Sequence, residues 1–303
     1  MRRVVFGDNL PVLQSLASGS VPLIYIDPPF NTGRAQSRTQ LRTARAAQGD
    51  RVGFGGHLYA TTRLATRSFD DAFDDFLGFL EPRLREAHRV LAPNGSFYFH
   101  IDYREVHYCK VLLDRIFGRE CFLNEIIWAY DYGARTNRRW PAKHDNILFY
   151  VKDPGNYVFN AEEVDREPYM APGLVGPEKA ARGKLPSSVW WHTIVSPSGR
   201  EKTGYPTQKP LGVLRRIITA SSKPGDLVLD FFAGSGTTGV AAAELGRDFL
   251  LVDNNEAALI AMAQRFAEFP GVEFVGFDPA PHLYGRPRVE STNGVRDDTA
   301  HTE

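Results

Sequence analysis

The sequence predicts an α/β fold built on a mainly parallel, twisted sheet. Strand signals and helix signals alternate along the chain, which is the pattern of parallel strands joined by crossover helices. The clearest strand, at residues 21–26, is apolar throughout, as expected for a strand buried on both faces. The chain has 303 residues, of which 43% are hydrophobic, and this is enough for a sizeable core.

The first half of the chain supplies two strands, two helices and an unusual turn. The strand at residues 21–26 ends at Asp27-Pro28-Pro29, because neither proline can donate a hydrogen bond to a sheet. Residues 70–91 place apolar side chains on one stripe and therefore predict an amphipathic helix. A turn at 92–95 leads into a strand at 96–101, and another helix follows.

The second half of the chain repeats the alternation with shorter connections. It predicts a helix at 211–222, a strand at 227–230, an alanine-rich helix at 237–245, a strand at 249–252 and a last helix before residue 270. After about residue 283 the chain turns polar, so we expect a frayed tail.

Two long connections interrupt this rhythm. Residues 34–68 are rich in Gly, Thr and Ala, and from 34 to 67 they carry seven arginines against one aspartate. Residues 153–204 hold many prolines and glycines with interspersed aromatics. Connections of this length are usually functional loops or a small inserted domain.

Composition excludes several classes of protein. Lys and Arg total 36, as do Asp and Glu, and no apolar run approaches the length of a membrane span. No charged-then-apolar leader opens the chain, so we expect a cytoplasmic protein. Two cysteines, Cys109 and Cys121, are too few for a disulfide framework or a zinc cluster. No histidine pair has metal-ligand spacing beside a third ligand, so we expect no metal.

A glycine-rich turn joins a predicted strand to the next helix at residues 230–239. Glycines let the backbone approach a ligand closely, and a helix N-terminus favours negative charge. Asp253 ends the following strand, where a carboxylate can accept hydrogen bonds from ribose hydroxyls. These features favour a nucleoside site, but Gly234, Gly236 and Gly239 also fit the dinucleotide pattern GxGxxG or a tight structural turn. No Gly-Lys-Ser/Thr follows, which excludes a P-loop.

The turn Asp27-Pro28-Pro29-Phe30 suits chemistry on an exocyclic amine. It ends a buried strand at its carboxyl edge, where open α/β sheets place their ligands. The Asp27 carboxylate and a backbone carbonyl held by the prolines can accept both N–H groups of such an amine and expose its lone pair. Phe30 can stack on a flat base. The alternative is a rigid turn with Phe30 in the core.

Together these turns resemble the motifs of S-adenosylmethionine-dependent DNA amino-methyltransferases in the permuted, beta-type order. The catalytic motif reads Asp-Pro-Pro-Phe-Asn-Thr-Gly at 27–33, and the cofactor motif FxGxG lies at 232–236. Between them, Gly-Tyr-Pro-Thr-Gln-Lys-Pro at 204–210 resembles the family's segment upstream of the cofactor motif. The resemblance covers residues 4–152 and 185–270 and implies a Rossmann-like methyltransferase fold with circularly permuted motif order.

The resemblance also implies roles for the matching residues. Asp8 would contact the cofactor's adenine, with Asp278 as the alternative, and Lys209 would lie near its methionine carboxylate together with Thr207 and Gln208. The catalytic residues would be Asp27, Pro28, Pro29 and Phe30. The cofactor-binding set would be Asp8, Asp27, Lys209, Asp230, Phe232, Ala233, Gly234, Ser235, Gly236, Thr237, Thr238 and Asp253.

A base inside a duplex has to be flipped out to reach the methyl group, which costs free energy. A methyltransferase of this kind must therefore bind double-stranded DNA through its phosphates and base edges. Basic residues follow the catalytic turn and form a second cluster further along. The expected DNA-binding residues are Arg34, Arg38, Arg42, Arg45, Arg135, Arg138, Arg139 and Lys143. A solvated arginine-rich loop is the alternative interpretation.

The resemblance divides the chain into six parts by its motif order. They are the first part of the catalytic domain (1–33), a basic DNA-facing loop (34–69), the middle of the catalytic domain (70–152), a target-recognition region (153–203), the cofactor-binding part (204–283) and a flexible tail (284–303). Further partners left open are a cognate restriction endonuclease and a second copy of the chain.

The first residue of the catalytic motif, Asp27, bears on the choice of target base. In this family Asp leans towards adenine N6 and Ser towards cytosine N4, so Asp27 favours adenine and leaves cytosine N4 as the alternative. An RNA or protein-glutamine methyltransferase, a nicotinamide oxidoreductase and a catalytically inactive DNA-binding module are more distant alternatives.

Overall fold

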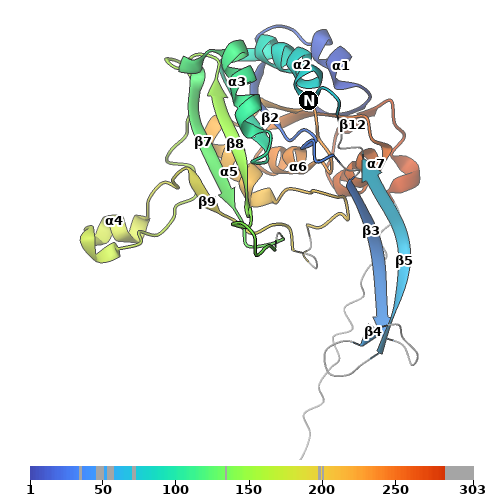
Figure 1. Cartoon of the computed structure of the whole chain (residues 1–303). Coiled ribbons are helices and arrows are strands. Elements are labelled where there is room, and N and C mark those ends of the chain that lie inside the picture. The colour runs from blue at the N-terminus through green and yellow to red at the C-terminus, as the bar shows by residue number, and fades with distance from the viewer. Residues whose placement is uncertain are drawn as a thin grey trace, which may run out of the picture.

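A nine-stranded sheet forms the centre of the computed structural model (Figure 1). The structure describes residues 1–33, 36–45, 51–52, 58–69, 73–133, 135–196, 199 and 201–283. Its strands are β1 (Arg2–Phe6), β2 (Val21–Ile26), β6 (Leu91–Ile101), β7 (Phe122–Ala129), β8 (His144–Val151), β9 (Val189–Trp191), β10 (Leu227–Asp230), β11 (Asp248–Asp253) and β12 (Val272–Val275). Their spatial order is β12-β1-β11-β10-β2-β6-β8-β7-β9. Only β8 pairs antiparallel to its neighbours, so the predicted α/β fold with a mainly parallel sheet is confirmed.

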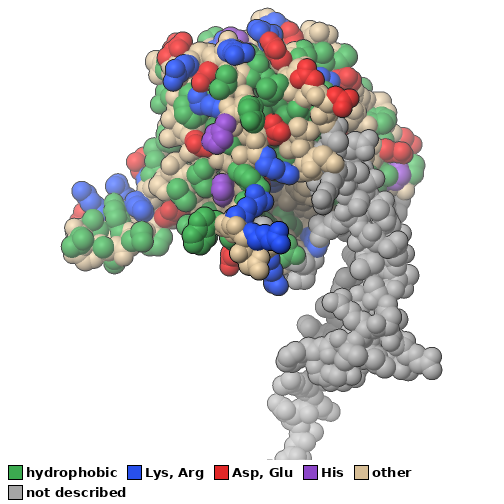
Figure 2. Space-filling view, in the orientation of Figure 1, with side chains coloured by type: hydrophobic (Ala, Val, Ile, Leu, Met, Phe, Trp, Pro, Cys, Tyr) green, Lys and Arg blue, Asp and Glu red, His purple; other side chains and the backbone are tan. Residues whose placement is uncertain are grey.

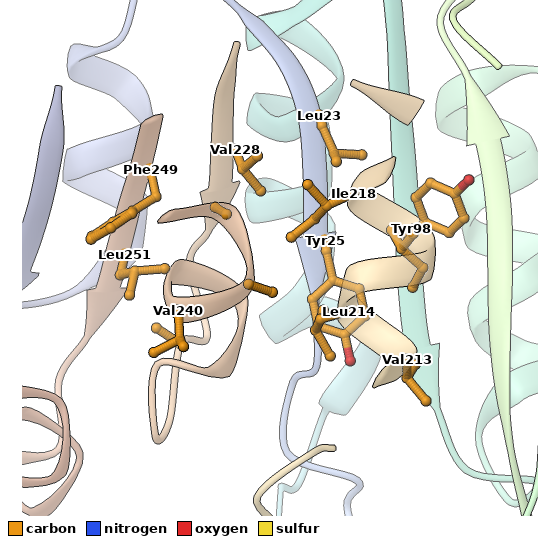
Figure 3. Packing of buried hydrophobic residues seen from close by; sticks show 14 of the residues in the cluster. Leu23, Tyr25, Tyr98, Val213, Leu214, Ile218, Val228, Val240, Phe249 and Leu251 are labelled. Carbon is orange, nitrogen blue, oxygen red and sulfur yellow. The ribbon is translucent and has the colours of Figure 1, made fainter. Parts of the chain in front are cut away.

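Helices cover both faces of this sheet. The period-2 alternation of β2 sends Leu23 and Tyr25 to one face and Ile24 and Ile26 to the other, into two separate hydrophobic clusters. The first face packs against α5 (Leu211–Ser221), α6 (Thr237–Glu244) and α7 (Glu256–Phe266), as Figure 3 shows for α5 and α6. The second face packs against α1 (Asn9–Ser15), α2 (Phe76–Val90) and α3 (Val106–Phe117).

The strand order brings the two predicted turns together. β10 lies between β11 and β2, and its register pairs Leu229 with Leu250 and with Ile24. The carboxyl ends of β1, β2, β10 and β11 therefore meet at one edge of the sheet, which we call the site edge. Parallel sheets place ligands at this edge.

Two of the predicted element boundaries differ from the structure. The helix predicted from residue 70 begins at Phe76, because the Asp75 side chain caps it by accepting a hydrogen bond from Gly78 N at 2.8 Å. The turn predicted at 92–95 lies inside β6, where the pairing with β2 shifts register between Val21 and Leu23 and absorbs the extra residues.

The prediction of a loop at 34–69 is wrong for much of that segment. β3 (Gln36–Arg45) and β5 (Leu58–Phe69) pair antiparallel and, with the short β4 (Arg51–Val52), form a separate three-stranded sheet. Figure 1 shows this hairpin extending away from the nine-stranded sheet. Its repeated threonines favour strands. The apolar alternation that normally reveals a strand is missing from the sequence.

The predicted target-recognition region contributes a strand to the sheet. β9 pairs with β7 at the edge, and α4 (Pro177–Arg182) lies on a part of this region that projects from the body in Figure 1. The predicted tail at 284–303 and Arg34 lie outside the described residues. Within the described ranges, no helix has the length and apolar character that crossing a membrane requires.

Candidate active site

A cavity of about 730 Å³ opens at the site edge. Its walls come from the ends of β1, β2, β10 and β11 and from the segment before α5. All four predicted catalytic residues line it, and so do all predicted cofactor-binding residues except Gly236. The volume lies within the range of small-molecule and cofactor sites, roughly 300–1,000 Å³.

The glycine-rich turn holds a backbone that other residues would strain. Gly234 and Gly236 have φ values of +50° and +73°, in the left-handed region that favours glycine. A Cβ atom on Gly236 would lie 2.7 Å from Met262 Cγ, and one on Gly239 would lie 2.6 Å from Leu251 Cδ1. Two of these glycines therefore let α6 pack closely, and Gly234 faces the cavity.

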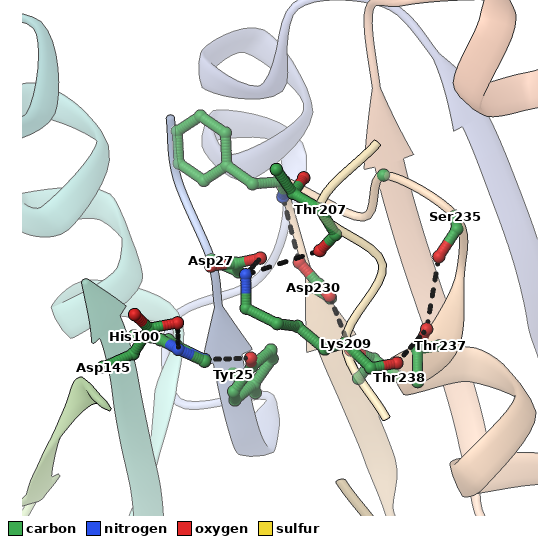
Figure 4. Close-up of polar contacts among 12 residues, drawn as sticks. Tyr25, Asp27, His100, Asp145, Thr207, Lys209, Asp230, Ser235, Thr237 and Thr238 are labelled. Atoms are coloured by element: carbon green, nitrogen blue, oxygen red, sulfur yellow. Dashed lines mark hydrogen bonds and ion pairs between the residues drawn. The ribbon is translucent and has the colours of Figure 1, made fainter. Parts of the chain in front are cut away.

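Two carboxylates, the buried Asp230 and the partly buried Asp253, hold this turn by hydrogen bonds. Asp253 accepts hydrogen bonds from Gly234 N at 2.7 Å and from Asn255 N at 2.8 Å. Asp230 accepts from Phe232 N at 3.0 Å and from Thr238 Oγ1 at 2.6 Å (Figure 4). Burial raises the pKa of Asp230 to about 7 and the pKa of Asp253 to about 6, against the opposing effect of these hydrogen bonds. Asp230 therefore stabilises the turn through its hydrogen bonds and also lines the cavity.

The Asp27 carboxylate has one paired and one unpaired oxygen. Lys209 Nζ lies 2.7 Å from Asp27 Oδ2 (Figure 4). The same atom lies 4.8 Å from the centre of the Phe30 ring. Asp27 Oδ1 is buried and has no hydrogen-bond partner among the residues that the structure describes. The side chains of Asp27 and Lys209 are only 16% and 9% exposed. Sequence reasoning placed Lys209 near the cofactor but did not foresee this ion pair.

An aromatic wall and a partly buried arginine line the side of the cavity next to β1. Phe79 lies 6.1 Å from Phe232, and the Arg83 guanidinium stacks on Phe79 at 4.0 Å. Arg83 also contacts Asp8 at 3.1 Å. Phe79 and Arg83 were missed by the sequence reasoning, although their i, i+4 spacing lies off the core stripe of α2 and could have indicated a second functional face. Asp8 lines the cavity, whereas Asp278 does not.

A buried polar network lies beside Asp27 and was also missed. Tyr25 Oη lies 2.7 Å from His100 Nδ1, and His100 Nε2 lies 3.2 Å from Asp145 Oδ2 (Figure 4). Tyr130 Oη donates to Asp145 Oδ1 at 3.0 Å, and the Phe30 ring lies 5.9 Å from the His100 ring. Burial alone would raise the pKa of Asp145, but His100, Lys209 and Tyr130 together hold it below its usual range. The network thus links the catalytic turn to β6, β7 and β8.

Two non-glycine residues beside the cavity have left-handed backbone conformations. Asn31, directly after the catalytic turn, has φ +53°, and Thr207, two residues before Lys209, has φ +58°. Such conformations cost free energy, most of all for a β-branched residue, and they cluster at functional sites. Asn31 is held by its side chain, which accepts from Phe73 N and donates to Glu105.

The predicted DNA-binding residues fall into two groups. The backbones of Arg38, Arg42 and Arg45 lie on β3. The second group lies on the connection between β7 and β8 at the site edge, where Arg135, Arg138 and Arg139 are exposed. Lys143 instead pairs with Asp131 at 2.6 Å, so part of its charge is already neutralised.

A deep cavity between a glycine-rich turn and an Asp-Pro-Pro-Phe turn defines an α/β protein with a nucleoside-type site at the carboxyl edge of its sheet. The family model of N6/N4 DNA methylases matches residues 21–264. The type II methyltransferase M.HpaI of Haemophilus parainfluenzae is 30% identical over 279 residues, which cover 91% of this chain and 76% of that protein. The DNA adenine methyltransferase YhdJ of Escherichia coli (strain K12) is 31% identical over 262 residues, which cover 84% and 79% of the two chains.

Solved structures of DNA methyltransferases share the fold of this chain. A putative DNA modification methylase of Thermus thermophilus, complexed with S-adenosyl-L-methionine, superposes with a TM-score of 0.57 at 24% identity, covering 92% of this chain and all of that one. The PvuII DNA methyltransferase, described as cytosine-N4-specific, superposes with a TM-score of 0.60 at 17% identity, covering 88% and 86%. The chain belongs to the N6/N4 DNA methylase family and is a DNA methyltransferase.

Proposed function

We propose that the chain transfers a methyl group from S-adenosylmethionine to the exocyclic amine of a flipped-out base in double-stranded DNA, with adenine N6 as the favoured target. The observation that carries this proposal is the Asp27 carboxylate, which lines the cavity and keeps one oxygen without a hydrogen-bond donor among the described residues. A buried acceptor without a donor is costly, and because Asp27 lines the cavity, an N–H of a ligand bound there would relieve that cost.

The residues at the cavity fit S-adenosylmethionine. Gly234 offers a close backbone approach, Asp253 retains acceptor capacity for ribose hydroxyls, and Lys209 supplies a positive charge for a carboxylate. Asp8 lies at the far wall, where it would meet the adenine. Family members in complex with this cofactor support the assignment. When bound, the cofactor supplies an electrophilic methyl group, and we expect the reaction to need no metal.

The catalytic turn provides the acceptors that activate the target amine. Asp27 Oδ1 would accept one N–H of the amine, and a backbone carbonyl held by Pro28 and Pro29 would accept the other. Both contacts would draw the nitrogen towards tetrahedral geometry and expose its lone pair, and Asp27 would take the proton that the methylated amine must lose. Phe30 would hold the base by stacking, a contact worth about 1–3 kcal/mol.

Adenine is favoured over cytosine for two reasons. The motif begins with Asp27 rather than Ser, and one relative that matches most of the chain is described as a DNA adenine methyltransferase. Cytosine N4 remains the second candidate, because the PvuII enzyme shares the fold and is described as specific for that position.

The finer architecture is part of the same proposal. The order of the motifs along the chain, with Asp27 before the glycine-rich turn, supports a circularly permuted methyltransferase fold. Residues 153–203 would form the target-recognition region, and the hairpin of β3 and β5 would face the DNA. A cognate restriction endonuclease and a homodimer remain the proposed further partners, in the cytoplasm.

The proposal is tested by transfer of labelled methyl groups from S-adenosylmethionine to unmethylated genomic DNA. We expect transfer by the wild-type protein and at least a hundredfold loss in Asp27→Ala, with cofactor binding still detectable by calorimetry. Asp278→Ala is the matched control and should stay active, because this carboxylate does not line the cavity. Excess RNA that abolished the labelling of DNA would favour the RNA alternative.

A further inference from the structure

The connection between β7 and β8, residues 130–143, presents an isolated tryptophan to solvent. Of the chain's four tryptophans, Trp128 and Trp190 are buried, whereas Trp140 is 94% exposed. An indole has a large apolar surface that proteins normally bury at least in part. Nothing in the described chain covers Trp140, so this side chain is available to a partner.

This connection begins beside the catalytic turn. Tyr130, its first residue, donates a hydrogen bond to Asp145, which contacts His100, and the His100 ring lies 5.9 Å from the ring of Phe30. β7 runs parallel to β6 and ends at the site edge, so the connection lies on the side of the protein from which a base must enter. In Figure 2, blue side chains gather at the lower edge of the body, where Figure 1 places the end of β7 and the start of β8.

The charge of the connection matches a nucleic-acid backbone. Arg135, Arg138 and Arg139 are exposed, and neither Arg135 nor Arg138 forms an ion pair with a described residue. Arg139 donates a hydrogen bond to Tyr103 Oη at 3.2 Å, which ties this part of the connection to the body. Cations of this kind bind phosphates and position a protein on the duplex without reading sequence.

The residue that follows Trp140 limits its freedom. Pro141 disfavours helical backbone at the preceding residue and keeps Trp140 extended. A large aromatic side chain on a restrained backbone loses less conformational entropy on binding than one on a flexible tip.

We propose that Trp140 is a wedge that enters the base stack of the DNA where the target base leaves it; this inference rests on the proposed function. Flipping a base out of a duplex costs a few kcal/mol and leaves a gap between its neighbours. Apolar side chains inserted between base steps are a known way to hold a distorted duplex. The arginines beside Trp140 would hold the flanking phosphates while the indole stacks on the bases that border the gap.

Trp191 offers a matched control at the same edge. It is 77% exposed, but it lies on β9, one strand further from the catalytic turn, and no arginine adjoins it in the sequence. Its backbone is fixed by the pairing of Trp191 with Ala129. Loss of this indole should therefore weaken DNA binding without a specific effect on base flipping.

The test compares two duplexes that carry the recognition sequence mapped from methylated DNA. In one the target base is paired, and in the other it lies opposite an abasic site, so its pairing is already lost and flipping costs less free energy. Trp140→Ala should lower kcat/KM for the paired duplex roughly 10- to 100-fold, the range expected for one lost stacking contact, and for the abasic duplex by less than about threefold. Trp191→Ala should affect both duplexes to a similar extent.

Fluorescence of 2-aminopurine at the target position gives a readout that does not need methyl transfer. Wild-type protein should raise this fluorescence on binding, and Trp140→Ala should give a much smaller rise at saturating protein. Equal losses on the paired and abasic duplexes, or an unchanged fluorescence rise, would overturn the wedge while leaving the methyltransferase proposal intact. A wild-type protein that methylates no DNA would instead overturn the proposed function.

Discussion

Replacement of Lys209 by methionine removes the only cation that contacts the Asp27 carboxylate among the described residues. Lys209 Nζ lies 2.7 Å from Asp27 Oδ2, and Asp27 Oδ1 already lacks a donor there. Methionine has similar length and apolar character, so the variant mainly loses the charge. The carboxylate is then left largely buried with neither oxygen paired within the described chain.

The size of the effect follows from burial. Removing one partner of a buried ion pair costs about 3–5 kcal/mol. Because the side chain of Asp27 is 16% exposed, we expect the lower end, about 3 kcal/mol in the free energy of unfolding. The assay is urea denaturation of the two single variants Lys209→Met and Asp27→Asn and of the double variant at pH 7.

A double-mutant cycle separates the pair from other effects of substitution. The double variant should be destabilised by less than the sum of the two single variants, with a coupling of about 2 kcal/mol. Lys143→Met is the control, because Lys143 also pairs with an aspartate at 2.6 Å but that partner, Asp131, is 86% exposed, and stability should hardly change. Strict additivity, or a Lys209→Met cost no larger than the control, would show that Lys209 does not stabilise the Asp27 carboxylate.

Four further predictions follow from the structure. Gly239→Ala should cost about 1–3 kcal/mol in urea unfolding, because the added methyl group meets Leu251 at 2.6 Å, and a neutral result would contradict the packing of α6. Since burial raises the pKa of Asp230 to about 7, its ionisation removes stability as pH rises from about 4 through 7. Asp230→Asn should therefore gain stability relative to wild type between pH 5 and pH 8, by an amount on the order of a few kcal/mol; a constant difference would exclude this titration. Burial raises the pKa of Cys109 to about 12, so iodoacetamide at pH 8 should leave this thiol unmodified in the folded protein, as peptide mapping would show. EDTA should leave methyl transfer unchanged, and activity restored by an added divalent ion would overturn the metal-free mechanism.

The parts of the fold that were predictable are those with strong local signals. Pro28 and Pro29 end β2, and positive-φ glycines mark the turn before α6, because these residues restrict or extend backbone conformation wherever they occur. Apolar runs such as 21–26 predicted buried parallel strands for the same local reason. The hairpin of β3 and β5 was not predictable this way, because strands without an apolar face lack the alternation that reveals them.

The candidate site likewise has a part that local sequence signals predict and a part that they do not. The turns at Asp27 and Gly234 could be located from sequence because each contains its own backbone signal. The contacts of Lys209 with Asp27 and of His100 with Asp145 join segments far apart in the chain, and only the order of the strands brings them together. Aspartate is usually exposed and histidine is intermediate in burial, so the burial of His100 and Asp145 beside the catalytic turn had no local signature.

Identification of the methylated nucleoside tests the central claim most directly. Purified protein would be incubated with unmethylated genomic DNA and isotope-labelled S-adenosylmethionine, and the digested DNA analysed by mass spectrometry. We expect label in N6-methyladenine, and we expect it to be absent with Asp27→Ala. Label in N4-methylcytosine would overturn the choice of base, and label in neither nucleoside would contradict the proposed function of this site.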